Sequence, residues 1–259
     1  MLVTTRAELA APNAKQLSAG ERPGSAFNGE HEEVTAVEVL VTGGDTDLAR
    51  TIAEGFRDGG HKVTLVGARR DDLEVVAKEL DVNAITCDTN DPASLSETRG
   101  LFPHHLDTII NVPTPDFDAS DPRTFSLSDT ANAWRTALDA TVLSAVLTVQ
   151  SVGDHLRSGG SIIGVLAKNP PAGSAEAAIK AALSNWVAGQ AGVFGTRGIT
   201  VNAIACGRSV QAGYEGLSRT PPPVAAEITR LALFLTTPAS RHITGQTLHV
   251  SQGALAHFS

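Results

Sequence analysis

The stretch that decides the fold is Val-Glu-Val-Leu-Val-Thr-Gly-Gly-Asp-Thr-Asp-Leu-Ala, which runs from residue 37 to residue 49. Its first five residues are mostly apolar, as in a short buried strand, and the run ends in a turn at Gly43 and Gly44. Apolar residues then recur at helical spacing, at Leu48, Ile52, Ala53 and Phe56. The pattern predicts a strand, a tight turn and a helix.

The same alternation continues along the chain. Strands are predicted at 37–41, 62–66, 84–87, 106–112, 161–166, 200–205 and 247–250. Further helices are predicted at 72–80, 130–156, 175–194 and 224–235. Helix-length connections between strands are typical of a parallel sheet covered on both faces. We therefore expect an α/β fold, with one doubly wound domain at 34–259 built on a seven-stranded, mostly parallel sheet.

Composition limits the possible partners. The 259 residues carry a net charge of -8, so no positive field attracts nucleic acid or an anionic membrane. The longest apolar stretch, 137–152, is interrupted by polar residues and predicts a core helix. Residues 1–33 are polar and lack periodicity, which predicts a flexible tail.

The two cysteines, Cys87 and Cys206, lie far apart without metal-type spacing. No charged and apolar leader precedes a cleavage site. We expect a cytoplasmic protein with reduced thiols and no metal. Cys206, at a strand end, is interpreted as a buried inert thiol, because no histidine stands beside it in sequence. The alternative for Cys206 is a nucleophile.

Several motifs occur in an order that resembles one family. They are 39–44 (Val-Leu-Val-Thr-Gly-Gly), 87–91 (Cys-Asp-Thr-Asn-Asp), 106–111 (Leu-Asp-Thr-Ile-Ile-Asn), 179–183 (Ile-Lys-Ala-Ala-Leu), 198–202 (Gly-Ile-Thr-Val-Asn) and 243–246 (Ile-Thr-Gly-Gln). From about residue 37 to 253 the chain resembles the short-chain dehydrogenase/reductase family, in its acyl-carrier-protein reductase-like branch. The resemblance implies a Rossmann fold, a nicotinamide dinucleotide, and dimers or tetramers formed through the long helices.

The resemblance also assigns residues to the cofactor. Gly43 and Gly44 match the phosphate-binding turn, Asp88 the acid that contacts adenine, and Asn111 the start of the family's Asn-Asn-Ala-Gly run. Lys180 matches the lysine that touches the ribose. These matches predict where a dinucleotide would lie, if one binds.

The phosphate loop departs from the family's Thr-Gly-x-x-x-Gly-x-Gly. Its second and third glycines fall on Asp47 and Ala49, and Asp45 adds another acid. The loop binds pyrophosphate with backbone amides and the positive end of a helix, so a carboxylate there opposes the ligand. In the alternative interpretation, Asp45, Thr46 or Asp47 caps its own helix.

The catalytic positions depart further. The family's asparagine, serine, tyrosine and lysine match Thr141, Ala167, Glu176 and Lys180, so only the lysine remains. Glu176 could act as a base, but a cation four residues away favours its charged form and makes it a poor acid. A simpler interpretation is an i to i+4 ion pair between Glu176 and Lys180.

Residues 67–70, Gly-Ala-Arg-Arg, follow the second predicted strand and lack the acid that would bind a free ribose 2'-hydroxyl. Arg69 and Arg70 suit a 2'-phosphate, so any cofactor is predicted to be NADP. Equally, these arginines could belong to a solvated turn that opens a helix.

Three functions remain open from the sequence. The favoured one is a non-catalytic or very weakly active relative that acts as a binding or assembly subunit, as a homo-oligomer or with an active paralogue. The second is an NADP(H)-dependent oxidoreductase with a displaced proton donor. The third uses Glu176 and Lys180 as base and electrostatic stabiliser in a proton transfer or dehydration.

Overall fold

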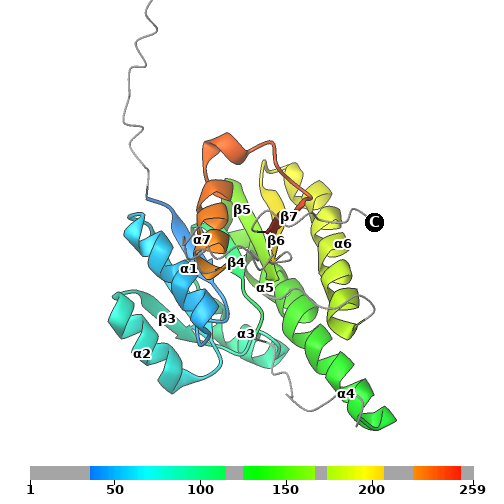
Figure 1. Cartoon of the computed structure of the whole chain (residues 1–259). Helices are drawn as coiled ribbons and strands as arrows, with labels where there is room; N and C mark the ends of the chain where they lie inside the picture. The colour runs from blue at the N-terminus through cyan, green and yellow to red at the C-terminus, as the bar shows by residue number, and fades with distance from the viewer. Residues whose placement is uncertain (1–35, 115–124, 167–173, 207–223, 252–259) are drawn as a thin grey trace, which may run out of the picture. The chain divides into compact units, whose positions relative to one another are not determined.

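The structure is a computed structural model that describes residues 36–114, 125–166, 174–206 and 224–251 (Figure 1). Its seven strands are β1 (Glu38–Val41), β2 (Lys62–Gly67), β3 (Asn83–Thr86), β4 (Leu106–Asn111), β5 (Leu156–Leu166), β6 (Thr200–Cys206) and β7 (Thr247–Val250). They form one sheet in the order β3-β2-β1-β4-β5-β6-β7. All six pairings are parallel, which confirms the predicted doubly wound fold.

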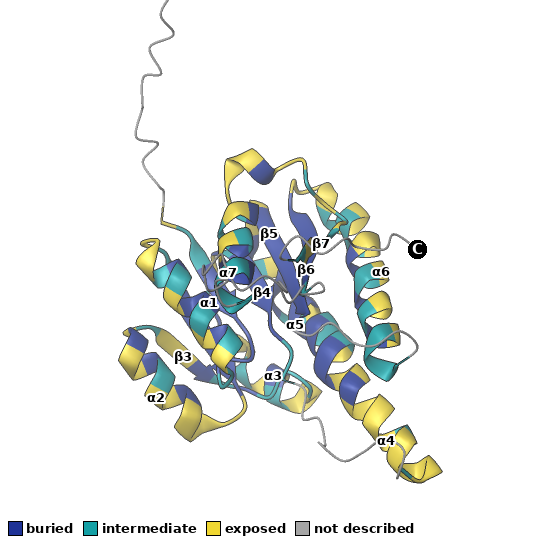
Figure 2. Cartoon of the chain, viewed as in Figure 1, coloured by how far each residue is buried: buried dark blue, intermediate teal, exposed yellow. Residues whose placement is uncertain are grey.

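The helices that cover the sheet are α1 (Asp47–Asp58), α2 (Arg70–Leu80), α3 (Pro92–Thr98), α4 (Leu127–Leu138), α5 (Ser144–Val152), α6 (Ala175–Gly195) and α7 (Val224–Leu235). One core cluster packs α1, α2 and α7 on one face of the sheet. A second packs α3, α5 and α6 on the other. The inner strands β1, β4 and β6 are almost wholly buried, shown in dark blue in Figure 2, whereas the edge strands β3 and β7 are mostly exposed or half-buried.

Two element boundaries differ from the sequence prediction. The helix expected at 130–156 is α4, a π-helical turn at Asp139–Leu143, and α5, and it ends at Val152. β5 begins at Leu156, earlier than the predicted 161, because residues 157–160, Arg-Ser-Gly-Gly, read as a turn but extend the strand. The sequence analysis also missed α3, which buries only Leu95.

The helical stretch Leu127–His155 is long and apolar enough, by length and composition alone, to cross a membrane. Ala145, Val149 and Val152 are buried in the core cluster under the sheet. This packing agrees with the predicted core helix. Residues 1–33, predicted as a flexible tail, lie outside the described residues, and the tail stays a prediction.

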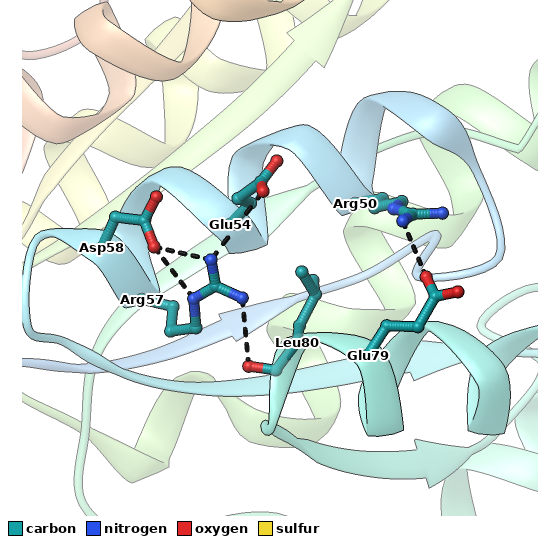
Figure 3. A network of polar contacts seen from close by, with 6 residues as sticks. All are labelled: Arg50, Glu54, Arg57, Asp58, Glu79 and Leu80. Atoms are coloured by element: carbon teal, nitrogen blue, oxygen red, sulfur yellow. Dashed lines mark hydrogen bonds and ion pairs between the residues drawn. The ribbon is translucent and has the colours of Figure 1, made fainter.

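Polar contacts join α1 to α2 at the surface (Figure 3). The Arg50 guanidinium lies 2.7 Å from the Glu79 carboxylate. Arg57 donates to the carbonyl oxygen of Leu80 at 3.3 Å, and so binds the end of α2 as well as its neighbour Asp58. These contacts hold the two helices that flank the β1–α1 turn.

The strand order reverses between β1 and β4, since β2 and β3 lie on one side of β1 and β4 to β7 on the other. In open α/β sheets a ligand binds outside the carboxyl ends of the strands at such a reversal. The candidate site is therefore the edge of the sheet where β1 ends at Val41 and β4 at Asn111.

Candidate functional site at the carboxyl ends of the strands

The turn after β1 depends on glycine at two positions. Gly43 has φ +66°, and a Cβ there would lie 2.5 Å from the carbonyl oxygen of Val112. A Cβ on Gly44 would lie 2.7 Å from a methyl carbon of Leu73 on α2. A side chain at either position would push apart the strand ends or α2. The predicted turn is thus present, with its backbone packed close to the end of β4.

The side chain of Thr46 caps α1. Its hydroxyl accepts from the Ala49 amide at 3.2 Å and donates to the Gly43 carbonyl oxygen at 2.7 Å. Of the three residues considered from the sequence, Thr46 is therefore the cap. Asp47 is exposed in the first turn of α1, where its charge favours the helix dipole. Because it faces solvent, its repulsion of a bound pyrophosphate is screened.

Asp45, by contrast, is buried and pairs with Arg69. Its side chain is 5% exposed, and its Oδ2 lies 2.9 Å from Nε of Arg69. Nη2 of Arg69 donates to the Asp45 carbonyl oxygen at 2.6 Å, and Nη1 lies 3.0 Å from the carboxylate of Asp72. All three nitrogens of the guanidinium thus face acceptor oxygens of the protein.

Arg70 is the first residue of α2, and it lies on an exposed surface 3.5 Å from the Glu74 carboxylate. No contact that the structure describes turns the side chain of Arg69 or Arg70 toward a site that could hold an anion. Asp72 and Glu74 on α2 contact Arg69 and Arg70 respectively, while Asp45 after β1 also pairs with Arg69.

Asp88 lies just after β3 in a turn of its own. Its carboxylate accepts from the Asn90 amide at 2.9 Å, and its own amide donates to the Ser94 hydroxyl at 3.0 Å. The Oδ1 atom of Asn90 is buried and accepts no hydrogen bond from the described residues. An unfilled acceptor therefore lies beside the residue that the sequence matched to adenine binding.

Asn111 ends β4 and is 5% exposed. Neither its Nδ2 nor its Oδ1 has a hydrogen-bond partner among the described residues. Buried polar groups are nearly always satisfied, so an orphaned amide at a strand end favours a bound molecule or water there. Asn111 after β4, Asp45 after β1 and Asn90 after β3 thus each carry a buried polar atom without a partner among the described residues, at the carboxyl-end edge of the sheet.

The four positions matched to catalysis fall as follows. Thr141 is buried in the π-helical turn between α4 and α5, a distortion that is frequent at functional sites. Glu176 and Lys180 lie one turn apart on α6, and no ion pair joins them in the described part of the chain, so the expected helix pair is absent. Ala167 lies outside the described residues.

Solved structures of known proteins share the fold of this chain. Three solved structures match at TM-scores of 0.67 to 0.69: a short-chain dehydrogenase/reductase from Serratia marcescens (0.67, 24% identity, 84% of this chain and 97% of that one), another from Mycobacterium ulcerans (0.69, 18%, 84% and 89%), and a blue fluorescent protein from a metagenomic library in complex with NADPH (0.67, 22%, 85% and 98%). At these identities they show the fold.

The sequence model of the family described as Enoyl-(Acyl carrier protein) reductase matches residues 44–254. The chain belongs to the short-chain dehydrogenase/reductase family. A Mycobacterium tuberculosis H37Rv protein named "Putative oxidoreductase Rv1856c" is 82% identical over 222 residues, which are 86% of this chain and all of that protein. A protein of the same species, strain CDC 1551, named "Putative oxidoreductase MT1904" matches equally well.

A short-chain dehydrogenase/reductase generally binds a nicotinamide cofactor, so its fit can be tested on this chain. Buried polar atoms of Asp45, Asn90 and Asn111 lack hydrogen-bond partners among the described residues, and Gly43 lets the backbone of the turn pack against the end of β4. These features fit a dinucleotide bound at the carboxyl ends of the strands.

The sequence analysis missed a second polar group at the end of β6. β6 pairs with β7 so that Ala205 lies opposite His249 and Cys206 opposite Val250. The charge of Lys180 acts on both Cys206 and His249, so three titratable groups lie close together. The pairing of β6 with β7 places His249 at the end of β6, 43 residues after Cys206, and Lys180 comes from α6, so no local pattern could have revealed the cluster.

Burial governs the titration of this cluster. It lowers the pKa of Lys180, which the thiol of Cys206 partly opposes. Burial also raises the pKa of Cys206, against the effect of the Lys180 charge. The pKa of His249 is lowered by burial and then by Lys180. Cys206 is half-buried and not buried as the sequence predicted, while its raised pKa favours the thiol, as expected of an inert cysteine.

Proposed function

We propose that this short-chain dehydrogenase/reductase binds a nicotinamide dinucleotide but does not carry out ordinary carbonyl or acyl reduction, and acts as a binding or assembly subunit. The observation that carries the proposal is the residue one turn before Lys180. It is Glu176, a carboxylate, where the resemblance requires a phenol that transfers a proton.

The chain's own residues would divide the binding as follows. The Gly43–Gly44 turn and the N-terminal end of α1 would receive the pyrophosphate, because amides and the helix dipole favour an anion there. Asp88 would contact adenine and Lys180 the ribose next to the nicotinamide. The bound nucleotide would supply a hydride. Glu176 offers a carboxyl group, and not the phenol that the resemblance requires, for the accompanying proton transfer.

Two further features limit turnover. Ala167, matched to the serine that orients the substrate oxygen, cannot donate a hydrogen bond. Thr141 has a short side chain where the family has an amide. The first change removes a hydroxyl that would act on a reacting oxygen, and the second replaces an amide with a shorter hydroxyl group.

Titration of the purified protein with NADH and with NADPH, followed by calorimetry, tests the binding. An assay of nucleotide oxidation with a panel of ketones and acyl thioesters tests the chemistry. The proposal expects binding in the first and background rates in the second. Turnover at about 1 per second or faster, an ordinary enzymatic rate, would overturn it.

A second candidate is an oxidoreductase with a displaced proton donor. It is favoured by Lys180, which keeps its place near the sheet edge beside Cys206 and His249. The chain has one tyrosine, Tyr214, which lies outside the described residues. If turnover is found, its loss in Tyr214→Phe or in His249→Gln would identify the donor, and Lys180→Met would show the role of the lysine.

We also propose a homo-oligomer, or an assembly with an active relative, formed through the long helices. Exposed apolar side chains gather on this part of the chain: Leu127, Trp134, Leu138, Leu143 and, on α6, Val193. Figure 2 shows the free end of α4 as exposed. Analytical ultracentrifugation of Trp134→Glu should show a smaller species than wild type. Val75→Glu, on exposed α2, is the matched control and should not. A cytoplasmic location stays a prediction.

A further inference from the structure

The last residue of β2 has no side chain, and another residue fills the space next to it. A Cβ on Gly67 would lie 3.2 Å from Oδ1 and 3.4 Å from Cγ of Asp45. In dinucleotide-binding folds the acid that binds the ribose 2'-hydroxyl follows the second strand, about twenty residues beyond the glycine turn. In this chain the carboxylate of Asp45, which comes from the turn after β1, lies within contact distance of the position that a Cβ on Gly67 would take.

One oxygen of that carboxylate has no donor. Asp45 is 5% exposed, and its Oδ2 is held by Nε of Arg69 at 2.9 Å. Its Oδ1 is buried and makes no hydrogen bond within the described residues. A buried acceptor without a donor is unfavourable, so a ligand that brings a hydroxyl to this atom gains a charge-assisted hydrogen bond.

The arginine that the sequence analysis matched to a 2'-phosphate is already engaged. Nε and Nη2 of Arg69 face Asp45, and Nη1 faces Asp72. A 2'-phosphate would have to displace these contacts, and it would also place about two negative charges beside the Asp45 carboxylate. Arg70 lies with Glu74 on an exposed surface and offers no described contact toward this site.

We propose that Asp45 is the specificity-determining carboxylate of this site: it accepts the 2'-hydroxyl of an unphosphorylated adenosine ribose, and the protein binds NAD(H) in preference to NADP(H). This inference rests on the proposed nucleotide binding and reverses the NADP preference predicted from Arg69 and Arg70. The pairing of Asp45 with Arg69 both positions the carboxylate and removes the cation that a 2'-phosphate needs.

The test is a calorimetric titration of the full chain with NADH and with NADPH, so its readout is binding and not activity. Wild type should bind NADH about ten-fold more tightly than NADPH, or better, as expected for one charge-assisted hydrogen bond. Asp45→Ala should lower that ratio by about ten-fold or more, through weaker NADH binding and stronger NADPH binding. The freed Arg69 would then face the 2'-phosphate.

Two variants separate this role from a purely structural one. Asp47→Asn removes an exposed acid two residues away and should leave the NADH to NADPH ratio unchanged. Asp45→Asn keeps an acceptor of the same shape and should keep more NADH binding than Asp45→Ala. If Asp45 only fixes the turn, Asp45→Ala would lower the melting temperature and weaken both nucleotides by the same factor.

The outcomes are distinct. Equal or tighter binding of NADPH by wild type, or an unchanged ratio in Asp45→Ala, overturns the role of Asp45 and leaves nucleotide binding intact. Absence of binding of both nucleotides at millimolar concentration overturns the proposed function and this inference together. A ratio that favours NADH and falls in Asp45→Ala alone supports the inference.

Discussion

At the ends of β1, β2 and β3 most polar side chains hold one another in a defined arrangement, whereas the amide at the end of β4 has no partner among the described residues. The first region has a capped α1, the Asp45–Arg69 pair and the Asp88 turn. The second has Asn111 at the end of β4 and, on α6, Lys180 with a lowered pKa.

The difference follows from what the fold itself requires. Glycine at 43 and 44 lets two strand ends and a helix approach, so the nucleotide-shaped turn is also a folding requirement. The side chain at position 176 is half-buried near the start of α6 and makes no hydrogen bond or ion pair within the described residues. Catalytic side chains at such positions can be replaced without loss of stability. A chain can therefore keep the turn that binds a nucleotide and lose its catalytic residues.

The largest effect should come from the first region. Gly43→Ala places a Cβ 2.5 Å from the Val112 oxygen at φ +66°, and should lower the free energy of unfolding by about 3 kcal/mol or more, measured in urea. Gly189→Ala, in open space on α6, is the control and should stabilise by about 0.5–1 kcal/mol. Equal effects of the two would show that the turn is not strained as described.

The second region is tested by restoring a phenol. Glu176→Tyr should raise nucleotide-dependent carbonyl reduction about ten-fold or more above the wild-type background, less than a full general acid gives, because Ala167 and Thr141 still differ from the family. Glu176→Phe has the same ring without the hydroxyl and should stay at background. A gain shared by both variants would mean that the phenol transfers no proton.

A smaller effect concerns acid stability at the opposite edge of the sheet, where β1 and β2 begin. Burial lowers the pKa of His61, whose Nδ1 accepts from the Val37 amide at 3.4 Å. The folded histidine then binds fewer protons than the unfolded one just below its ordinary value of 6.5, so the free energy of unfolding falls as pH drops through that range.

Urea unfolding at about pH 7.5 and about pH 5.5 checks this dependence, where His61→Asn should show a smaller fall than wild type. His249 has a pKa shifted in the same direction, so the variant reduces the dependence without abolishing it. An identical fall of the free energy of unfolding in both proteins would show that His61 does not cause the pH dependence.

The smallest effect is expected for the surface pair between α1 and α2 (Figure 3). Arg50 and Glu79 are 45% and 49% exposed, so a double-mutant cycle to alanine should give a coupling of about 0.5 kcal/mol that decreases in high salt. A coupling that is insensitive to salt would mean that the pair is more shielded from water than its exposure indicates.

The sequence predicted most of the fold, because each strand is an apolar run between helix-length segments. It missed α3, because a single buried leucine shows no helical periodicity. It placed the start of β5 too late, because Gly159 and Gly160 are typical of a turn but belong to the strand. For the site, it predicted roles for Gly43, Asp88 and Lys180 from the order of the motifs, and these roles stay predictions.

The sequence could not show which way side chains point once strands are neighbours. Asp45 and Arg69 are 24 residues apart and meet only because β1 and β2 end side by side. The arginine therefore looked available for a phosphate. In the same way, no histidine stands near Cys206 in the sequence, but the pairing of β6 with β7 brings His249 near it.

The central claim is that the protein binds a nicotinamide dinucleotide but does not use it to reduce a carbonyl or acyl group. The most direct test of this claim is a single-turnover measurement. Protein in excess over NADH is mixed with a ketone or an acyl thioester, and nicotinamide fluorescence is followed. The account predicts a change of emission on binding, followed by no loss of reduced nucleotide over hours. Oxidation of the bound NADH within seconds, or no change of emission at all, would contradict it.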